Sequence, residues 1–184
     1  MIQPIYLYGS EVLRKKAQEA DLEKKEELTA LIQDLKDTLQ HADGCGLAAP
    51  QIGVSLRVVI VDGDVVSDVY DYLKDFRRVF INPVILEESE EKTTYQEGCL
   101  SIPNLYCDVV RPARITVEYY NERFEKVTET FDKFGCRMIQ HELSHLDGNL
   151  FTDNVPPIRK KMIAGKLQNI AKGKVHPHYN TKLK

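Results

Sequence analysis

The residues with the clearest chemical role lie at positions 140–148, which read QHELSHLDG. On a helix, His141 and His145 lie on one face, about 40° apart, because four positions separate them. Two imidazoles on adjacent turns can hold one metal ion, and Glu142 beside them can move protons for a water on that ion. A lone histidine is usually a core residue, but this His-Glu-x-x-His pattern predicts a hydrolytic metal site.

The flanking sequence predicts the helix that these residues need. Asp132 can cap its start, and Gly148 can end it. Glu142 falls between two apolar stripes. Burying a carboxylate there costs free energy, which is tolerated when the group has a hydrogen-bonding partner or a catalytic role. The stripes predict burial on two sides: Phe134, Met138, His141 and His145 form the first, and Ile139, Leu143 and Leu146 the second. The remaining face is expected to be wetter: Arg137, Gln140, Ser144 and Asp147.

Two histidines do not complete a catalytic metal site, which normally has three protein ligands and an open position. A third histidine six positions after His145 would complete a known protease pattern, but Phe151 stands there and cannot ligate. Beyond Phe151 the only acidic residue is Asp153. The third ligand is therefore expected upstream of the helix.

A cysteine is the leading candidate for this third ligand. Cys99 follows a glycine in the segment EGCLSIP, before a turn that ends in proline. Taken singly it would be read as inert packing, but a two-histidine site lacks a soft ligand. Cys107 lies in a strand-like run and Cys136 lies on the opposite side of the helix, so both are weaker candidates.

The segment GCGLAAPQIG at residues 44–53 is a second unusual stretch. Its glycines and proline are typical of a flexible turn. Against that reading, its only polar side chain is Gln51, within a run of small residues. Small residues let a backbone approach a ligand, and the Gln51 amide can donate a hydrogen bond into a site. It lacks the GKS/T ending of a phosphate-binding loop.

The overall composition limits the class of protein. A chain of 184 residues with 42% hydrophobic residues fits one domain, expected over residues 1–173. The net charge of −3 and the pI near 6.0 show that the chain as a whole lacks the excess positive charge typical of DNA-binding proteins. No apolar run has membrane-spanning length, and the four cysteines lack CxxC spacing. We expect a reducing, cytoplasmic location without membrane attachment.

The hydrophobic periodicity predicts helices over residues 24–42 and 158–173 beside the motif helix. For the first, Asp21 is the expected cap and Gly44 the expected stop. The last is basic and amphipathic, and we expect its face of Ile158, Met162, Ile163, Leu167 and Ile170 to dock on the core. The following residues, 174–184, are expected to be a flexible basic tail.

Strands are expected over shorter stretches. The expected strands are residues 56–61, residues 79–86 with a bend at Asn82-Pro83, residues 93–96, and a hairpin of residues 114–120 and 127–131. The acidic stretch 62–77 between the first two strands is expected to be a surface excursion.

Three segments together resemble the signature motifs of peptide deformylases: GCGLAAPQIG at 44–53, EGCLS at 97–101 and QHELSHLDG at 140–148. The resemblance spans about residues 5–155. It implies an α+β fold, with antiparallel β-sheets around a central metal-binding helix. It also implies an activity, the hydrolytic removal of the formyl group from the N-terminal formyl-methionine of nascent chains, with release of formate.

The resemblance assigns roles to individual residues. It implies that Cys99, His141 and His145 are the metal ligands and that Glu142 is the general base and then the acid. Gln51 and the backbone N–H of Leu100 would hold the formyl oxygen. Gly46 and Gly98 would contact the substrate backbone, and Phe134 and Met138 would line the pocket for the methionine side chain.

One divalent ion is the implied cofactor. Two imidazoles and a thiolate suit Fe(II), Zn(II), Ni(II) and Co(II) alike, whereas the resemblance points to Fe(II) in the cell. The family usually has aspartate where this chain has Ser144. On a helical wheel Ser144 points away from the metal, so we expect ligation to survive and the surrounding support to differ.

Two alternatives remain at this point. A zinc endopeptidase would not need Cys99, and a non-catalytic metal-binding or formyl-peptide-binding module would not need Glu142 or Gln51. The expected partners are N-formyl-methionyl peptides, and a transient ribosome contact through the basic residues 158–173 is a further hypothesis.

Overall fold

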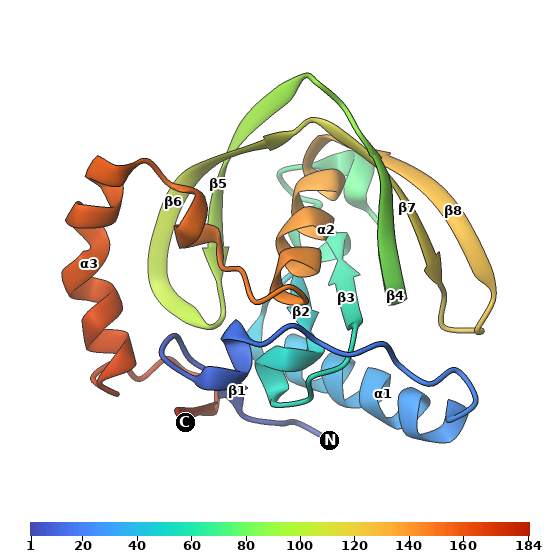
Figure 1. The fold of residues 1–184 in the computed structure, drawn as a ribbon, viewed down its shortest axis with the longest axis horizontal. Coiled ribbons are helices and arrows are strands. Elements are labelled where there is room, and N and C mark those ends of the chain that lie inside the picture. Colours follow the sequence, from blue (N-terminus) through green and yellow to red (C-terminus); the bar gives the residue numbers. More distant parts are fainter.

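The computed structural model describes all 184 residues and places helix α2 (Lys133–His145) at the centre of the molecule (Figure 1). Two antiparallel sheets surround this helix, as expected for the α+β class. The larger sheet has the strand order β2 (Gly46–Ala48), β3 (Val58–Asp62), β4 (Arg77–Glu88), β7 (Arg114–Tyr120) and β8 (Lys126–Asp132). The smaller sheet pairs β5 (Lys92–Cys99) with β6 (Ile102–Pro112).

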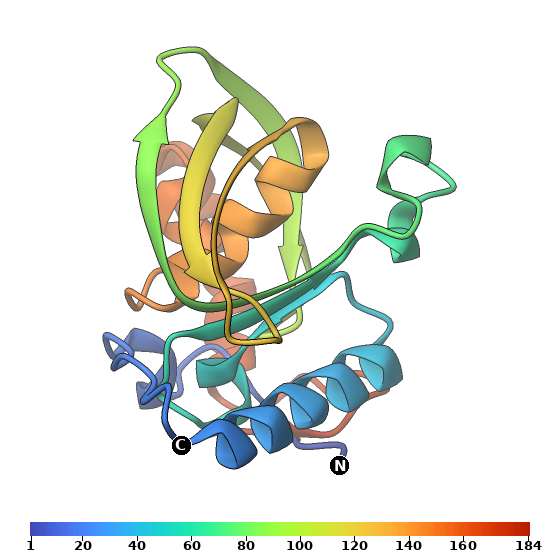
Figure 2. The ribbon, with the colours of Figure 1, turned by 90° about the vertical axis from the view of Figure 1, so that its right-hand side faces the viewer.

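Helix α1 (Lys25–Ala42) covers the face of the larger sheet that points away from α2 (Figure 2). It does so because its leucines and isoleucine recur at helical spacing and are buried: Leu28, Leu31, Ile32, Leu35 and Leu39. Its expected range is confirmed to within one residue, but its expected capping residues were wrong. The side chain of Asp21 does not cap the helix, and the left-handed residue at its end is Asp43, with φ 58°, rather than Gly44. Aspartate tolerates this conformation better than most residues.

The predicted bend in β4 is confirmed at Asn82. This residue has φ 51°, and the pairing register with β7 shifts between Ile81 and Val84. Its side-chain amide holds the bend in place, because Asn82 Oδ1 accepts from Ala20 N at 2.8 Å and Asn82 Nδ2 donates to Ala20 O at 3.0 Å. The hairpin of β7 and β8 is also confirmed.

Helix α2 is buried on more sides than its pattern suggested. The predicted stripes are buried except for half-buried Phe134, but Arg137 and Gln140 on the supposedly wetter face are only 2% and 6% exposed. The cause is the smaller sheet, whose strands supply backbone acceptors for the guanidinium: Arg137 donates to Val109 O at 2.6 Å and to Thr93 O at 2.7 Å. Asp132 precedes the helix without a side-chain capping bond.

The chain leaves α2 through Gly148, which has φ +78°. A Cβ atom there would lie 2.5 Å from the carbonyl oxygen of Arg14, so only glycine fits. The expected stop is therefore confirmed.

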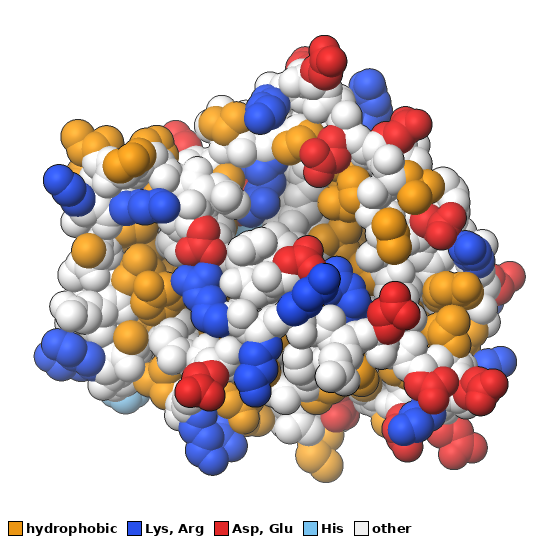
Figure 3. All heavy atoms as spheres, in the orientation of Figure 1, with side chains coloured by type: hydrophobic (Ala, Val, Ile, Leu, Met, Phe, Trp, Pro, Cys, Tyr) orange, Lys and Arg blue, Asp and Glu red, His pale blue; other side chains and the backbone are white.

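Helix α3 (Pro157–Ala171) packs against β6 at one side of the molecule. Ile163 and Ile170 are buried, but Ile158 and Met162 are 73% and 66% exposed, so the predicted docking face was partly wrong. At 100° per residue, those two side chains point about 110° away from the buried pair. Figure 3 shows hydrophobic and basic side chains side by side over the N-terminal end of this helix.

The two ends of the chain meet at the base of the molecule (Figure 1). Strand β1 (Ile5–Tyr6) pairs in parallel with β9 (Thr181–Lys182), and Tyr179 is buried in the core beneath α1. This packing differs from the expected flexible tail, because the backbone of residues 180–182 finds partners on β1.

Short 3₁₀ turns complete the fold: η1 (Glu11–Arg14), η2 (Ala49–Ile52), η3 (Gly63–Val66), η4 (Asp71–Leu73) and η5 (Phe151–Asn154). The stretch with η3 and η4 protrudes from the body, as expected (Figure 2). It is nevertheless anchored, because Leu73 is buried and packs towards α2. None of the helices combines the length and hydropathy that a membrane crossing needs.

Candidate active site

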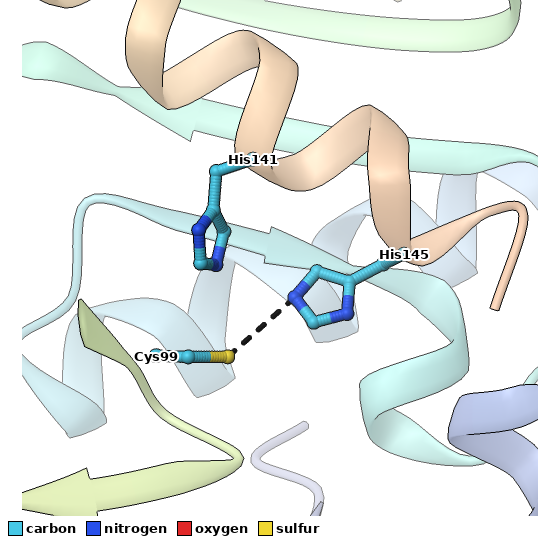
Figure 4. A group of neighbouring side chains, drawn as sticks. All are labelled: Cys99, His141 and His145. Carbon is cyan, nitrogen blue, oxygen red and sulfur yellow. Dashed lines mark hydrogen bonds between the residues drawn. The ribbon is translucent and has the colours of Figure 1, made fainter. Parts of the chain in front are cut away.

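The three residues predicted as metal ligands meet in one group. The ligand atoms of Cys99, His141 and His145 all lie within 4.8 Å of one another, and Cys99 Sγ is 3.5 Å from His145 Nε2. Figure 4 shows both imidazoles descending from α2 towards the thiol. A tetrahedral ion with ordinary Zn–S and Zn–N bonds would hold such S and N atoms about 3.5 Å apart. The group therefore has the size of a metal site.

Strand alternation explains how Cys99 reaches the helix. The predicted short strand is in fact longer, and β5 continues through Cys99. Successive side chains of a strand point to opposite faces, so Tyr95, Glu97 and Cys99 share the face towards α2. A register shift between Glu97 and Cys99 interrupts the pairing with β6, which resumes with Cys99 opposite Ile102. The thiol is thus presented at the end of a strand that the helix packs against.

The electrostatics of the group favour a cation. Burial lowers the pKa of His145 well below its usual value, which keeps this imidazole neutral and able to ligate. Burial alone would also lower the pKa of His141, but the Cys99 thiol and the Glu97 carboxylate raise it to about 10. Cys99 and Glu97 therefore stabilise a positive charge on the His141 ring, and their negative charge would also favour a divalent ion held there.

Glu97 orients the first histidine. Its Oε1 accepts from His141 Nδ1 at 2.8 Å, which leaves Nε2 of the same ring free to face Cys99. The carboxylate also accepts from Arg111 Nε and from an Arg137 Nη atom, each at 2.7 Å. Burial raises the pKa of Glu97, but the hydrogen bonds from His141 and Arg111 outweigh it and hold the pKa well below its usual value.

The sequence did not single out this buried network as functional. Glu97 lies inside the EGCLS motif, so its position two residues before Cys99 was an available signal. Arg111 and Arg137 carried no such signal, since an arginine on a strand or helix is ordinarily read as a solvated side chain.

Glu142 occupies the wall of the cleft beside Gly46. The side chain is buried, one carboxylate oxygen has no hydrogen-bond partner, and the other lies 3.8 Å from His141 Nε2. A Cβ atom on Gly46 would lie 2.8 Å from Glu142 Oε1, so this close packing requires glycine. Burial raises the pKa of Glu142 to about 7, where a carboxylate can both take and give a proton near neutrality.

Gln51 points its amide nitrogen into the site. Its Oε1 accepts from Ala48 N at 2.9 Å, which fixes the amide orientation. Its Nε2 then lies 3.0 Å from Ser101 Oγ and 3.5 Å from Cys99 Sγ. The hydrogen-bond donor predicted from the GCGLAAPQIG segment is therefore beside the metal group.

A cleft of about 650 Å³ opens onto these residues. All four residues predicted to contact substrate line it: Gly46, Gly98, Phe134 and Met138. Gly46 lies on β2, the edge strand of the larger sheet, so one side of its backbone faces the cleft. Phe134 stacks on Tyr70 of the protruding stretch, with ring centroids 4.5 Å apart. The stretch thus supports the apolar end of the cleft, which the sequence did not indicate.

Ser144 lies outside the metal group, as expected from the helical wheel. Its hydroxyl donates to the backbone carbonyl of His141 at 2.6 Å. The serine therefore bonds within its own helix and adds no charge to the site.

The fold, and a group of one cysteine and two histidines that could hold a metal ion beside an HExxH helix, fit the class of metal-dependent hydrolases. The profile of the polypeptide deformylase family matches residues 2–161. A peptide deformylase of Christiangramia forsetii is 44% identical over 186 residues, which cover 97% of this chain and 94% of that protein.

Solved structures agree with this result. A peptide deformylase from Legionella pneumophila superposes with a TM-score of 0.81 at 35% identity, covering 95% of this chain and 98% of that one. The enzyme from Thermotoga maritima has a TM-score of 0.76 at 37% identity, with 85% and 99% covered. The chain belongs to the polypeptide deformylase family. It is a hydrolase that removes the N-formyl group of nascent peptides, and the endopeptidase alternative is not supported.

Proposed function

We propose that Cys99, His141 and His145 hold the catalytic ion and that Glu142 moves the protons of the deformylation reaction. The observation that carries this proposal is the position of Glu142. Its buried carboxylate, with one oxygen unpaired, lies in the cleft wall beside the histidine that faces Cys99. Burying a carboxylate without a hydrogen-bonding partner costs free energy, and a catalytic role accounts for that cost.

The ion itself is proposed to be Fe(II) in the cell, with Zn(II), Ni(II) or Co(II) as substitutes, because two imidazoles and a thiolate suit all of them. When bound, it polarises a water and the formyl carbonyl. Glu97 holds Nδ1 of His141, which would leave Nε2 of that ring to ligate the ion.

Glu142 takes one proton from the attacking water at a carboxylate oxygen. The remaining hydroxyl adds to the formyl carbon, the carbon–nitrogen bond breaks, and Glu142 delivers its proton to the departing amine nitrogen. The immediate products are formic acid and a free amine. The acid then passes its proton to the more basic amine, which gives formate and a protonated N-terminus, so atoms and charges balance. A pKa near 7 suits both halves of this transfer.

The formyl oxygen gains negative charge during the addition, and two donors are proposed to stabilise it. The first is Nε2 of Gln51, already aimed at Cys99. The second is the backbone N–H of Leu100, directly after the ligand cysteine. Each preorganised donor of this kind typically contributes about 3–4 kcal/mol to stabilising the transition state.

The substrate is proposed to be an N-formyl-methionyl peptide that lies along the edge strand β2. Gly46 would pair with its backbone, and Gly98 would let it approach from the opposite wall. Phe134 and Met138 would surround the methionine side chain at the apolar end of the cleft.

The direct test is formate release from formyl-Met-Ala-Ser by anaerobically purified protein. Glu142→Ala is expected to lose at least about 10²-fold in kcat while its metal content stays that of the wild type. Cleavage of internal bonds in unformylated peptides is measured in parallel. Absence of formate release by the metal-loaded wild type would contradict the proposal.

We further propose a transient ribosome contact through α3, in the cytoplasm where nascent chains emerge. Exposed Ile158 and Met162 adjoin the exposed lysines Lys160, Lys161 and Lys166, a combination that fits an anionic surface with apolar recesses. Charge reversal of the three lysines is expected to abolish co-sedimentation with ribosomes at low salt. Unchanged co-sedimentation would contradict this contact.

A further inference from the structure

The turn that follows the ligand cysteine is held by both ends of the chain. The hydroxyl of Tyr179 donates to the carbonyl oxygen of Leu100 at 2.6 Å. The backbone N–H of Tyr8 donates to the carbonyl oxygen of the next residue, Ser101, at 2.8 Å. Two consecutive carbonyls of one tight turn therefore have partners that lie far away in the sequence.

The two holding segments are themselves joined. Ile5 N donates to Asn180 O and Leu7 N donates to Lys182 O, each at 2.9 Å, in the parallel pairing of β1 with β9. The bond from Tyr179 lies one residue before this pairing, and the bond from Tyr8 lies one residue after it. The terminal segments thus act on the turn as one unit, here called the terminal clamp (residues 5–8 and 179–182).

The side chain of Tyr179 is held in position by the hydrophobic core. The residue is only 9% exposed and belongs to the core cluster beneath α1, against which Leu100 also packs. Residues 177–179 also line the active-site cleft. The tail therefore borders the site, although the distance in sequence from Leu100 to Tyr179 is 79 residues.

The held turn carries two groups that the proposed function uses. Cys99 precedes it, and the N–H of Leu100 begins it. Fixing the Leu100 carbonyl and the Ser101 carbonyl restricts the backbone dihedrals between them, and the Ser101 hydroxyl is fixed separately by Gln51. A misplacement of about 1 Å in such groups can cost about 10²-fold in rate.

We propose that Tyr179 is a positioning residue of the deformylation reaction. Its hydrogen bond to the Leu100 carbonyl holds the turn that orients the Cys99 thiol and the Leu100 N–H. This inference rests on the proposed function for the role of those two groups. It assigns to the C-terminal tail a part in the active site.

The test compares Tyr179→Phe with the full-length wild type, both loaded with Co(II). The substitution removes one hydroxyl and keeps the buried ring. Tyr120→Phe is the matched control, because Tyr120 packs against the same core cluster and its hydroxyl makes no hydrogen bond within the protein. We expect kcat of Tyr179→Phe to fall about 10-fold per bound metal, with KM changed less than about twofold, and the control to stay near the wild type.

Amide hydrogen exchange gives a readout that does not depend on activity. We expect faster exchange in residues 99–103 of Tyr179→Phe alone, with the core strands unchanged. A Tyr179→Phe protein with the kcat and exchange of the wild type would overturn the inference, as would exchange that rises equally throughout the core. An inactive wild type would instead overturn the proposed function, so the two failures are distinguishable.

Discussion

Nδ1 of His141 lies 2.8 Å from Oε1 of Glu97, and this one contact determines which nitrogen of the ring faces Cys99. Glu97 can hold the ring in this way because two buried guanidiniums compensate its charge. The orientation of His141 towards Cys99 thus depends on the Glu97 carboxylate, which lies outside the proposed ligand set.

Glu97→Gln is expected to lower both stability and metal affinity. The amide keeps an acceptor for His141 but removes the charge opposite Arg111 and Arg137, whose side chains are about as buried as that of Glu97. Breaking such a buried pair costs about 3 kcal/mol of unfolding free energy, and loss of ligand support costs about 10-fold or more in metal affinity. Urea unfolding and metal titration measure the two effects. An exposed pair supplies the control, Glu118→Gln, and equal behaviour of both variants would contradict the role of the buried network.

Gly46→Ala is expected to impair catalysis while leaving the metal bound. The new methyl group would lie 2.8 Å from Cγ and Oε1 of Glu142, so the carboxylate has to move away from its place. We expect kcat for formyl-Met-Ala-Ser to fall by about 10²-fold. Gly165→Ala in α3 is the control, since a methyl group there meets nothing within 4 Å and is expected to raise stability by about 1 kcal/mol. Wild-type kcat in Gly46→Ala would contradict this account of Glu142.

Acid is expected to destabilise the larger sheet through Glu129. Burial raises the pKa of Glu129, but hydrogen bonds from Arg78 and Tyr119 outweigh it and lower the pKa below its usual 4.5. A depressed pKa contributes stability above about pH 4.5, and that contribution is lost as the pH falls further. Glu129→Gln is therefore expected to be less stable by about 1 kcal/mol at pH 7 and to lose less stability below pH 4.5 than the wild type. Parallel stability curves for both proteins, from urea unfolding at each pH, would contradict it.

Phe134→Ala is expected to weaken the recognition of formyl-methionine. The ring lines the cleft and lies between Tyr70 and Tyr95, with centroids 4.5 Å and 5.3 Å away. Removing it opens the apolar end of the cleft and loosens the stretch that carries Tyr70. We expect kcat/KM for formyl-Met-Ala-Ser to fall about 10-fold, the loss typical of a few methylenes of apolar contact. Phe124→Ala, at the far hairpin, is the control, and equal losses in both variants would contradict a role in recognition.

Local patterns in the sequence were sufficient for much of the fold and for the chemistry. The face shared by His141 and His145 follows from four residues of helical spacing, and the hairpin of β7 and β8 follows from alternation and one turn. The identity of Cys99 as the expected third ligand depended on its motif and on the absence of ligands downstream. The helix face and the hairpin depend on residues a few positions apart, and the choice of Cys99 depends on residue types alone, so none of them required the tertiary structure.

The tertiary structure decided which distant groups meet. Nothing near Arg137 in the sequence shows that the smaller sheet covers it, so its burial beside Glu97 was not predictable. The same holds for Tyr179, which reaches Leu100 only because β9 finds the edge of β1. An arginine or a tyrosine has many partners of suitable chemistry along the chain. Packing of the sheets and helices selects one of them, because only one arrangement buries the apolar faces and leaves few buried polar groups unpaired.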